Sequence, residues 1–114
     1  ASCATALAAL RHLRAHPELP GRLSALSQYA RDGFLKRGTK IKTSTTPIIP
    51  IYTYETIRTL SVAKELFDRG VYVNPVLPPA TAPDECLLRT SYMATLTEPL
   101  IDEALDIIKA VLDK

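Results

Sequence analysis

The sequence predicts an α+β fold, in which helices cover a small mixed or antiparallel sheet of about three to four strands. Stretches with apolar residues at three- and four-residue steps alternate with short stretches rich in β-branched residues, in the order ααββαββα. The 114 residues suffice for one domain, and 46% hydrophobic with 23% charged residues is typical of globular proteins. No unit of the chain repeats, which excludes a solenoid.

Residues 1–38 are expected to form two helices. The first covers residues 4–15 and ends before Pro17, because proline disrupts a helix interior. The second covers residues 19–37, where Gly38 can adopt the left-handed conformation of a helix cap. The expected apolar positions are Leu7, Leu10 and Leu13 in the first helix, and Leu23, Leu26, Ala30 and Phe34 in the second.

Residues 39–114 are expected to fold as ββαββα and to complete a single domain over residues 1–114. The strands predicted from β-branched or alternating residues are 40–43, 47–54, 71–76 and 86–93. Thr56 and Thr97 are the expected N-caps of the two helices. The expected apolar faces of these helices are Leu60, Ala63, Leu66 and Phe67, and Ile101, Leu105, Ile108 and Leu112. The prolines of residues 77–84 predict a loop.

The composition argues against several classes of partner. A net charge of +2, with scattered Lys and Arg and no aromatic ladder between them, argues against nucleic acid. No apolar run reaches the length of a membrane span. Cys3 and Cys86 lie far apart, which predicts two reduced thiols in a cytoplasmic protein. The chain opens ASCATALAAL, without Met or a basic leader, so we expect a piece of a larger protein.

Few residues of the sequence are candidates for chemistry. It contains no glycine-rich phosphate loop, nucleophile elbow, zinc motif or carboxylate cluster. His12 and His16 have the spacing of two metal ligands on a helix, but no third ligand is near, so we expect no metal. Asp102, Glu103 and Asp106 are expected to form the solvent face of the last helix.

Arg89 differs from the other charged residues because it lies in a predicted strand, directly after the proline loop. The alternation in LLRTSYM favours a half-buried strand, where an unpaired guanidinium is expensive. Its planar fork suits the carboxylate of a substrate. A structural ion pair with Glu85 or Asp102 explains the residue equally well, so both interpretations stay open here.

The segment GVYVNPVLPPATAPDECLLRTSYMATLTEPLIDEAL, residues 70–105, resembles the end of the α-oxoamine synthases, which are fold-type-I pyridoxal-phosphate enzymes. TPIIPI at residues 46–51 is similar to the first strand of their small domain. The resemblance covers nearly the whole chain and implies the small domain of the aminotransferase fold-type-I architecture. The positions that carry it are Gly70, Pro78, Pro79, Pro83, Leu88, Arg89, Ser91, Ala94 and Thr97.

The resemblance implies a carboxy-terminal fragment of an enzyme that condenses an amino acid with an acyl-CoA. It implies that the full-length enzyme is a homodimer whose larger preceding domain holds pyridoxal phosphate and most of the substrate contacts. The fragment alone is then expected to bind no cofactor and to be inactive. Within this chain, the resemblance implies that Arg89 binds the carboxylate of the amino acid. It also implies that the loop residues Pro79, Ala80 and Thr81 line the entrance for substrates.

Two positions depart from the family pattern. Leu96 replaces a histidine, so a polar role there is lost, and Leu77 replaces an arginine that some serine palmitoyltransferases carry before the loop. The second change argues against a mobile second carboxylate clamp, whereas VNPV with PPAT favours the serine palmitoyltransferase branch or a close bacterial relative. The amino acid and the acyl chain are not defined by the sequence. A free-standing, non-catalytic α+β interaction module is the alternative from another class.

Overall fold

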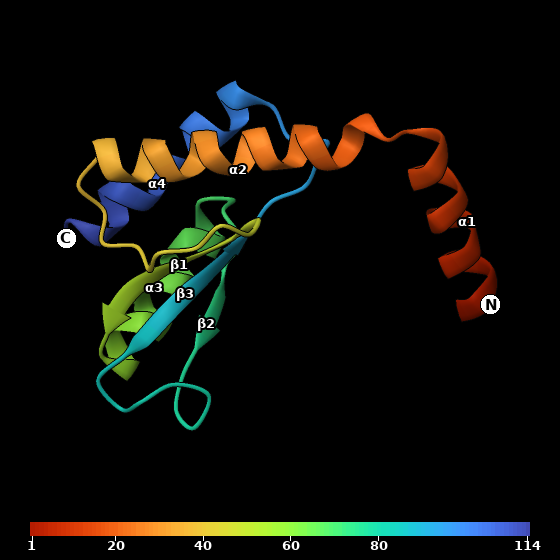
Figure 1. Cartoon of the computed structure of the whole chain (residues 1–114). Helices are drawn as coiled ribbons and strands as arrows, with labels where there is room; N and C mark the ends of the chain where they lie inside the picture. The colour runs from red at the N-terminus through yellow and green to blue at the C-terminus, as the bar shows by residue number, and fades with distance from the viewer.

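The computed structural model describes all residues 1–114 as four helices and three strands (Figure 1). The elements are α1 (Ser2–Ala15), α2 (Glu18–Lys36), β1 (Ile48–Tyr54), α3 (Thr56–Asp68), β2 (Asn74–Val76), β3 (Cys86–Ser91) and α4 (Glu98–Leu112). The predicted α+β fold is confirmed, and its sheet is antiparallel with the strand order β1-β3-β2. None of the four helices has the length and apolar content of a membrane span.

The strand expected at residues 40–43 is wrong. Only Ile41 forms a β-bridge there, to Ile51 of β1. The N–H of Lys42 donates to the carbonyl of Pro50 over 2.9 Å, but Pro50 has no N–H to return a bond. The ladder therefore ends after a single bridge, and the observed element order is ααβαββα, not ααββαββα.

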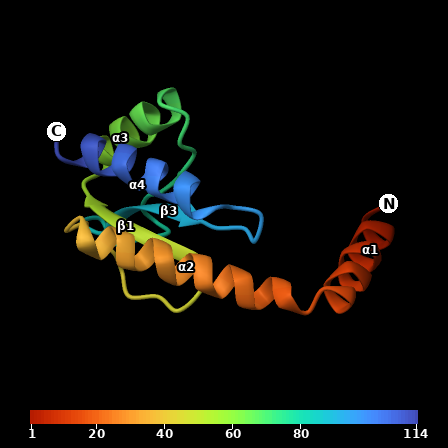
Figure 2. The same ribbon diagram turned by 90° about the horizontal axis from the view of Figure 1, so that it is seen from above.

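One face of the sheet is buried beneath α2, α3 and α4 (Figures 1 and 2). Because side chains alternate along a strand, Ile49 and Ile51 of β1 and Leu88 of β3 enter the core while their neighbours point the other way. The helices fill the other side of the core with Leu26, Ala30, Phe34, Val62, Leu66, Ile101, Leu105, Ile108 and Val111. The apolar faces expected for the second and the last helix are thus confirmed in large part.

Helices α2 and α4 approach closely at Gly33. A Cβ on this residue would lie 2.4 Å from Cδ1 of Leu105, so only glycine allows the observed contact. At the edge of the same contact, Nη2 of Arg37 lies 2.7 Å from Oδ1 of Asp106. Asp106 lies on the solvent face as expected, and it also pairs with the neighbouring helix.

The buried face of α3 also differs from the one expected. Thr59, Val62 and Leu66 are buried, whereas Leu60 and Phe67 are 47% and 62% exposed. The hydroxyl of Thr59 lies 2.6 Å from the hydroxyl of Thr53 on β1. The side of α3 that carries Thr59 therefore faces the sheet. Two buried hydroxyls that bond to each other cost little, and Thr59 and Val62 are buried where Leu60 and Phe67 were expected.

The chain leaves β1 through a β-bulge that ends at Tyr54, whose φ is +68°. Glu55 then occupies the N-cap position of α3, and Thr56, expected there, is the first helical residue. Thr97 does hold the N-cap position of α4, as predicted. A tyrosine in the left-handed region is uncommon, and a residue-by-residue reading of the sequence gives no signal for it.

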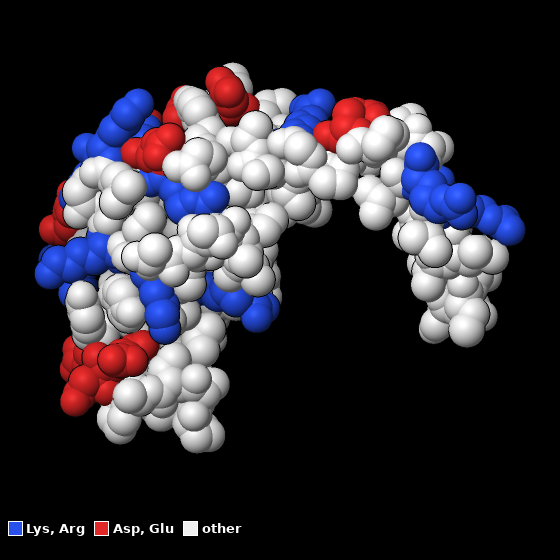
Figure 3. All heavy atoms as spheres, in the orientation of Figure 1, with Lys and Arg blue, Asp and Glu red and all other residues white.

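Helix α1 projects away from the rest of the molecule (Figures 1 and 2). All its residues are exposed, including the apolar stripe of Leu7, Leu10 and Leu13. In the space-filling view the molecule is an arch, with a hollow between α1 and the body (Figure 3). The helix forms as predicted, but within these residues nothing packs against its apolar stripe.

Candidate functional site

The candidate site is the face of the sheet that no helix covers, which we call the open face. Arg89 lies at its centre on β3, directly opposite Pro50 of β1 on one side and Asn74 of β2 on the other. The next row along the sheet contains Tyr52, Leu87 and Val76. Strand alternation places all these side chains on the side opposite the buried Leu88.

Arg89 is exposed on this face and takes part in none of the ion pairs of the structure. The strand is half-buried as expected, with Cys86, Leu88 and Thr90 on its buried face, but Arg89 lies on its exposed face and does not point into the core. The ion pair with Glu85 or Asp102, the alternative left open by the sequence, does not form. Asp102 instead accepts a hydrogen bond of 2.6 Å from the hydroxyl of Tyr29, and this bond raises the pKa of Tyr29.

Pro79, Ala80 and Thr81 lie in the loop that joins β2 to β3, at the end of the sheet where β3 begins. A turn closes this loop through the N–H of Ala80, which donates to the carbonyl of Leu77 over 3.0 Å. The hydroxyl of Thr81 is buried and has no hydrogen-bond partner. Arg89 lies three positions after Cys86, the first residue of β3, so the loop ends about 10 Å away at the rise of an extended strand.

The lysines do not offer a setting in which pyridoxal phosphate could be anchored. Lys36, Lys40 and Lys42 are exposed, and none of the six lysines is buried. The other three are held in ion pairs: Lys64 with Asp68, Lys109 with Asp113 and Lys114 with Glu65. A catalytic amine needs a desolvated pocket or a cationic neighbour that lowers its pKa. None of the six lysines lies in a desolvated pocket, so the lysines present do not fit the role of cofactor anchor.

The histidines of the first helix face each other without forming a metal site. The ring centroids of His12 and His16 are 4.4 Å apart, and Nδ1 of His16 lies 3.1 Å from a carboxylate oxygen of Glu18. No group of three or more potential metal ligands comes together in the structure. Cys3 is exposed and Cys86 is buried, and the two are not bonded to each other.

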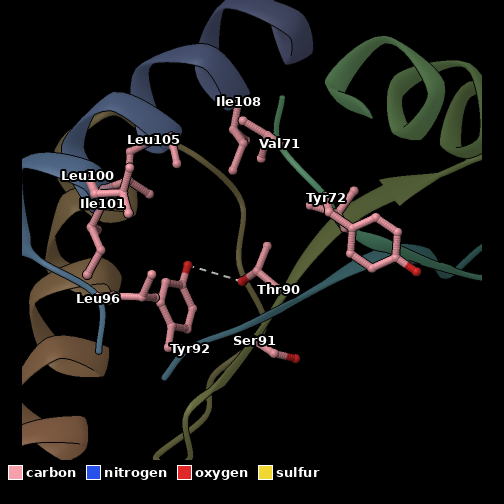
Figure 4. A pocket seen from close by; sticks show the side chains of 12 residues that line it. Val71, Tyr72, Thr90, Ser91, Tyr92, Leu96, Leu100, Ile101, Leu105 and Ile108 are labelled. Atoms are coloured by element: carbon pink, nitrogen blue, oxygen red, sulfur yellow. Dashed lines mark hydrogen bonds between the residues drawn. The ribbon is translucent and has the colours of Figure 1, made fainter. Parts of the chain in front are cut away.

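A small apolar cavity of about 120 Å³ lies between α4 and the end of β3 (Figure 4). Tyr92 points into it, with its hydroxyl 3.2 Å from that of Thr90, and burial raises the pKa of Tyr92. Leu96 and Leu100 line it as well, so the residue that replaces the family's histidine serves packing. The sequence showed no sign of this cavity, because its walls come from segments that are distant along the chain.

The comparisons with known proteins agree with this geometry. The chain belongs to the family described as aminotransferase class I and II, which matches residues 1–108. A serine palmitoyltransferase of Bacteroides ovatus is 41% identical over 111 residues, which are 96% of this chain and 28% of that protein. The resemblance drawn from the sequence is thereby confirmed.

Solved structures show the same similarity. A serine palmitoyltransferase from S. paucimobilis with bound PLP and myriocin superposes with a TM-score of 0.85 at 29% identity, over 95% of this chain and 28% of that one. An 8-amino-7-oxononanoate synthase from Francisella tularensis has a TM-score of 0.77 over 92% of this chain, and at 21% identity it shows the fold alone. The chain thus spans less than a third of the length of these relatives.

Proposed function

We propose that this chain is the carboxy-terminal domain of a larger pyridoxal-phosphate-dependent acyltransferase that condenses an amino acid with an acyl-CoA. The similarity to serine palmitoyltransferases along 96% of the chain supports this proposal. In this proposal the cofactor, the catalytic lysine and the subunit contacts of a homodimer belong to the rest of the enzyme, since the chain matches 28% of the relative's length. When bound, the cofactor supplies the electron sink for the condensation.

The observation that carries the proposal is the unpaired guanidinium of Arg89 at the centre of the open face. Arg89 is exposed, and neither of the carboxylates considered as its partner, Glu85 or Asp102, forms an ion pair with it. A planar fork without an internal acceptor can bind both oxygens of a carboxylate. In this proposal Arg89 binds and orients the carboxylate of the amino acid, and it takes part in no proton transfer.

The loop with Pro79, Ala80 and Thr81 is proposed to line the entrance to the same site. Its prolines restrict the backbone, and it leads directly into the start of β3, the strand that carries Arg89. The buried hydroxyl of Thr81 has no partner within this chain, so contact with the remainder of the enzyme would satisfy it.

The test is substitution of Arg89 in the full-length enzyme. Arg89→Ala should raise the KM for the amino acid by roughly 10- to 150-fold, since a charge-assisted hydrogen bond contributes about 1.5–3 kcal/mol. Arg89→Lys should recover only part of the loss, because an ammonium cannot form the bidentate contact. Arg69→Ala, which removes an exposed arginine of the Glu65 pair, is the matched control and should change nothing. Unchanged kinetics of Arg89→Ala would return this residue to a structural role.

The proposal that the isolated chain is inactive and binds no pyridoxal phosphate has its own test. Titration of the 114-residue chain with the cofactor should produce no absorbance band of a lysine–cofactor adduct. Appearance of such a band would contradict the assignment of the cofactor to the remainder of the enzyme. A parent reading frame without a long upstream coding region would instead support the non-catalytic module.

A further inference from the structure

Asn74 is the polar neighbour of Arg89 on the open face. The two residues are register partners in the antiparallel pair of β2 and β3, so their side chains stand on the same side of the sheet. Directly opposed residues have Cβ atoms about 4.5–5.5 Å apart, which brings an amide and a guanidinium within reach of one small ligand. On the other side of Arg89 the register partner is Pro50, which offers no polar side chain.

The amide of Asn74 is held in one orientation by Tyr72. The hydroxyl of Tyr72 donates to Oδ1 of Asn74 over 3.0 Å, and this bond occupies the acceptor end of the amide. The side chain of Asn74 makes no other hydrogen bond in the structure, so both protons on Nδ2 are free. Asn74 is half-buried, which limits how far its amide can turn away from the sheet.

On the open face, neither the guanidinium of Arg89 nor Nδ2 of Asn74 donates a hydrogen bond in the structure. Leu87 and Ser91 lie on either side of Arg89 along β3, and no carboxylate occupies the row formed with Pro50 and Asn74. An ionised carboxylate accepts about four hydrogen bonds, more than one arginine fork supplies. The arrangement is complementary to a single carboxylate that receives two bonds from Arg89 and a further one from Asn74.

We propose that Asn74 is a second binding residue for the carboxylate of the amino-acid substrate, fixed in place by Tyr72. This inference rests on the proposed function, because it takes Arg89 as the primary contact. Nδ2 of Asn74 supplies a neutral donor with a fixed direction. The guanidinium of Arg89 attracts the carboxylate, and the hydrogen bond from Asn74 fixes the orientation of that carboxylate. Tyr72 acts through Asn74 and is a positioning residue.

The experiment compares Asn74→Ala, Asn74→Asp and Tyr72→Phe with Arg89→Ala in the full-length enzyme. Asn74→Ala should raise the KM for the amino acid about tenfold, with the KM for acyl-CoA unchanged. Asn74→Asp should be worse than Asn74→Ala, because the new carboxylate pairs with Arg89 and competes with the substrate. Tyr72→Phe should raise the same KM by a few-fold. Gln28→Ala, which removes an exposed amide on α2, is the matched control.

The outcomes separate this inference from the proposed function. A large effect of Arg89→Ala with normal KM values in Asn74→Ala and Tyr72→Phe would overturn the role of Asn74 alone. No effect of Arg89→Ala would overturn both. Asn74→Asp with a KM equal to or below that of Asn74→Ala would also contradict the proposal. If Asn74→Ala does not fold, Tyr72→Phe decides, because Tyr72 is 74% exposed and its substitution leaves Asn74 in place.

Discussion

The two faces of β3 place neighbouring residues in opposite environments. Leu88 is fully buried among the helices, whereas Arg89, the next residue, is exposed on the open face and has no ion-pair partner. Thr90 again points inward, and its hydroxyl donates to the carbonyl of Ile49 over 2.8 Å. The two-residue period of its side chains thus gives the strand one packed face and one exposed face, and the proposed function assigns substrate binding to the exposed face. Substitutions along β3 should therefore alternate in what they damage.

The largest expected effect is that of Leu88→Ala. It removes a fully buried side chain from the centre of the sheet, so the free energy of unfolding should fall by about 2–5 kcal/mol. Urea unfolding followed by circular dichroism measures this change. A loss below 1 kcal/mol, within about the range of surface substitutions, would show that the inward face of β3 is not the main support of the core.

Thr90→Val should have an intermediate effect. The substitution keeps the shape of the side chain but leaves the carbonyl of Ile49 without the hydroxyl that reaches it in the core. The expected loss of stability is about 1 kcal/mol, the usual net contribution of a hydrogen bond. The same urea titration measures it, and Thr90→Ser serves as the control because it retains the hydroxyl.

Tyr92→Phe should change the dependence of stability on pH at the alkaline end. Burial raises the pKa of Tyr92 above its ordinary value of 10.0, so the unfolded chain loses this proton first as the pH rises. The contribution of the protonated Tyr92 to the free energy of unfolding is fully present below pH 10. It is lost as the pH rises through the higher folded-state pKa. The variant should show a shallower decline in thermal melts above pH 10. Some decline should remain, because the pKa of Tyr29 is also raised.

The smallest expected effect on stability is that of Arg89→Ala. An exposed residue without an ion-pair partner should change the free energy of unfolding by no more than about 0.5 kcal/mol. In the proposed function the same substitution weakens binding of the amino acid, so Arg89→Ala should affect binding and leave stability nearly unchanged. A loss as large as that of Leu88→Ala in the urea titration would contradict the division between the two faces.

Much of the fold could be predicted because its signals are local. Pro17 and Gly38 bracket α2, Thr97 precedes α4, and the prolines of residues 77–84 form a loop as expected. The predictions failed where another segment decides the outcome. Pro50 ends the pairing expected of residues 40–43, because a proline on the partner segment removes the donor that a longer ladder needs.

The candidate site was predicted only in part. Arg89 was singled out from its place in a strand after the proline loop, and the resemblance favoured a binding role, but its lack of an ion-pair partner depends on where Asp102 lies, and Tyr29 of α2 engages that carboxylate. Asn74 was not singled out, because nothing in the local sequence shows that it lies opposite Arg89. The alternation of Tyr72, Asn74 and Val76 on one side of their strand was the signal available for it.

The sequence by itself determined the family, the α+β fold class and the position of Arg89 in a strand after a proline loop. Periodicity, proline and glycine act over a few residues, so they can be interpreted without the fold. Only the tertiary structure decided which face of α3 is buried, that the stripe of α1 is left uncovered, and that Asn74 lies beside Arg89. These depend on strand register and helix packing, which join residues far apart in the chain and leave no local pattern.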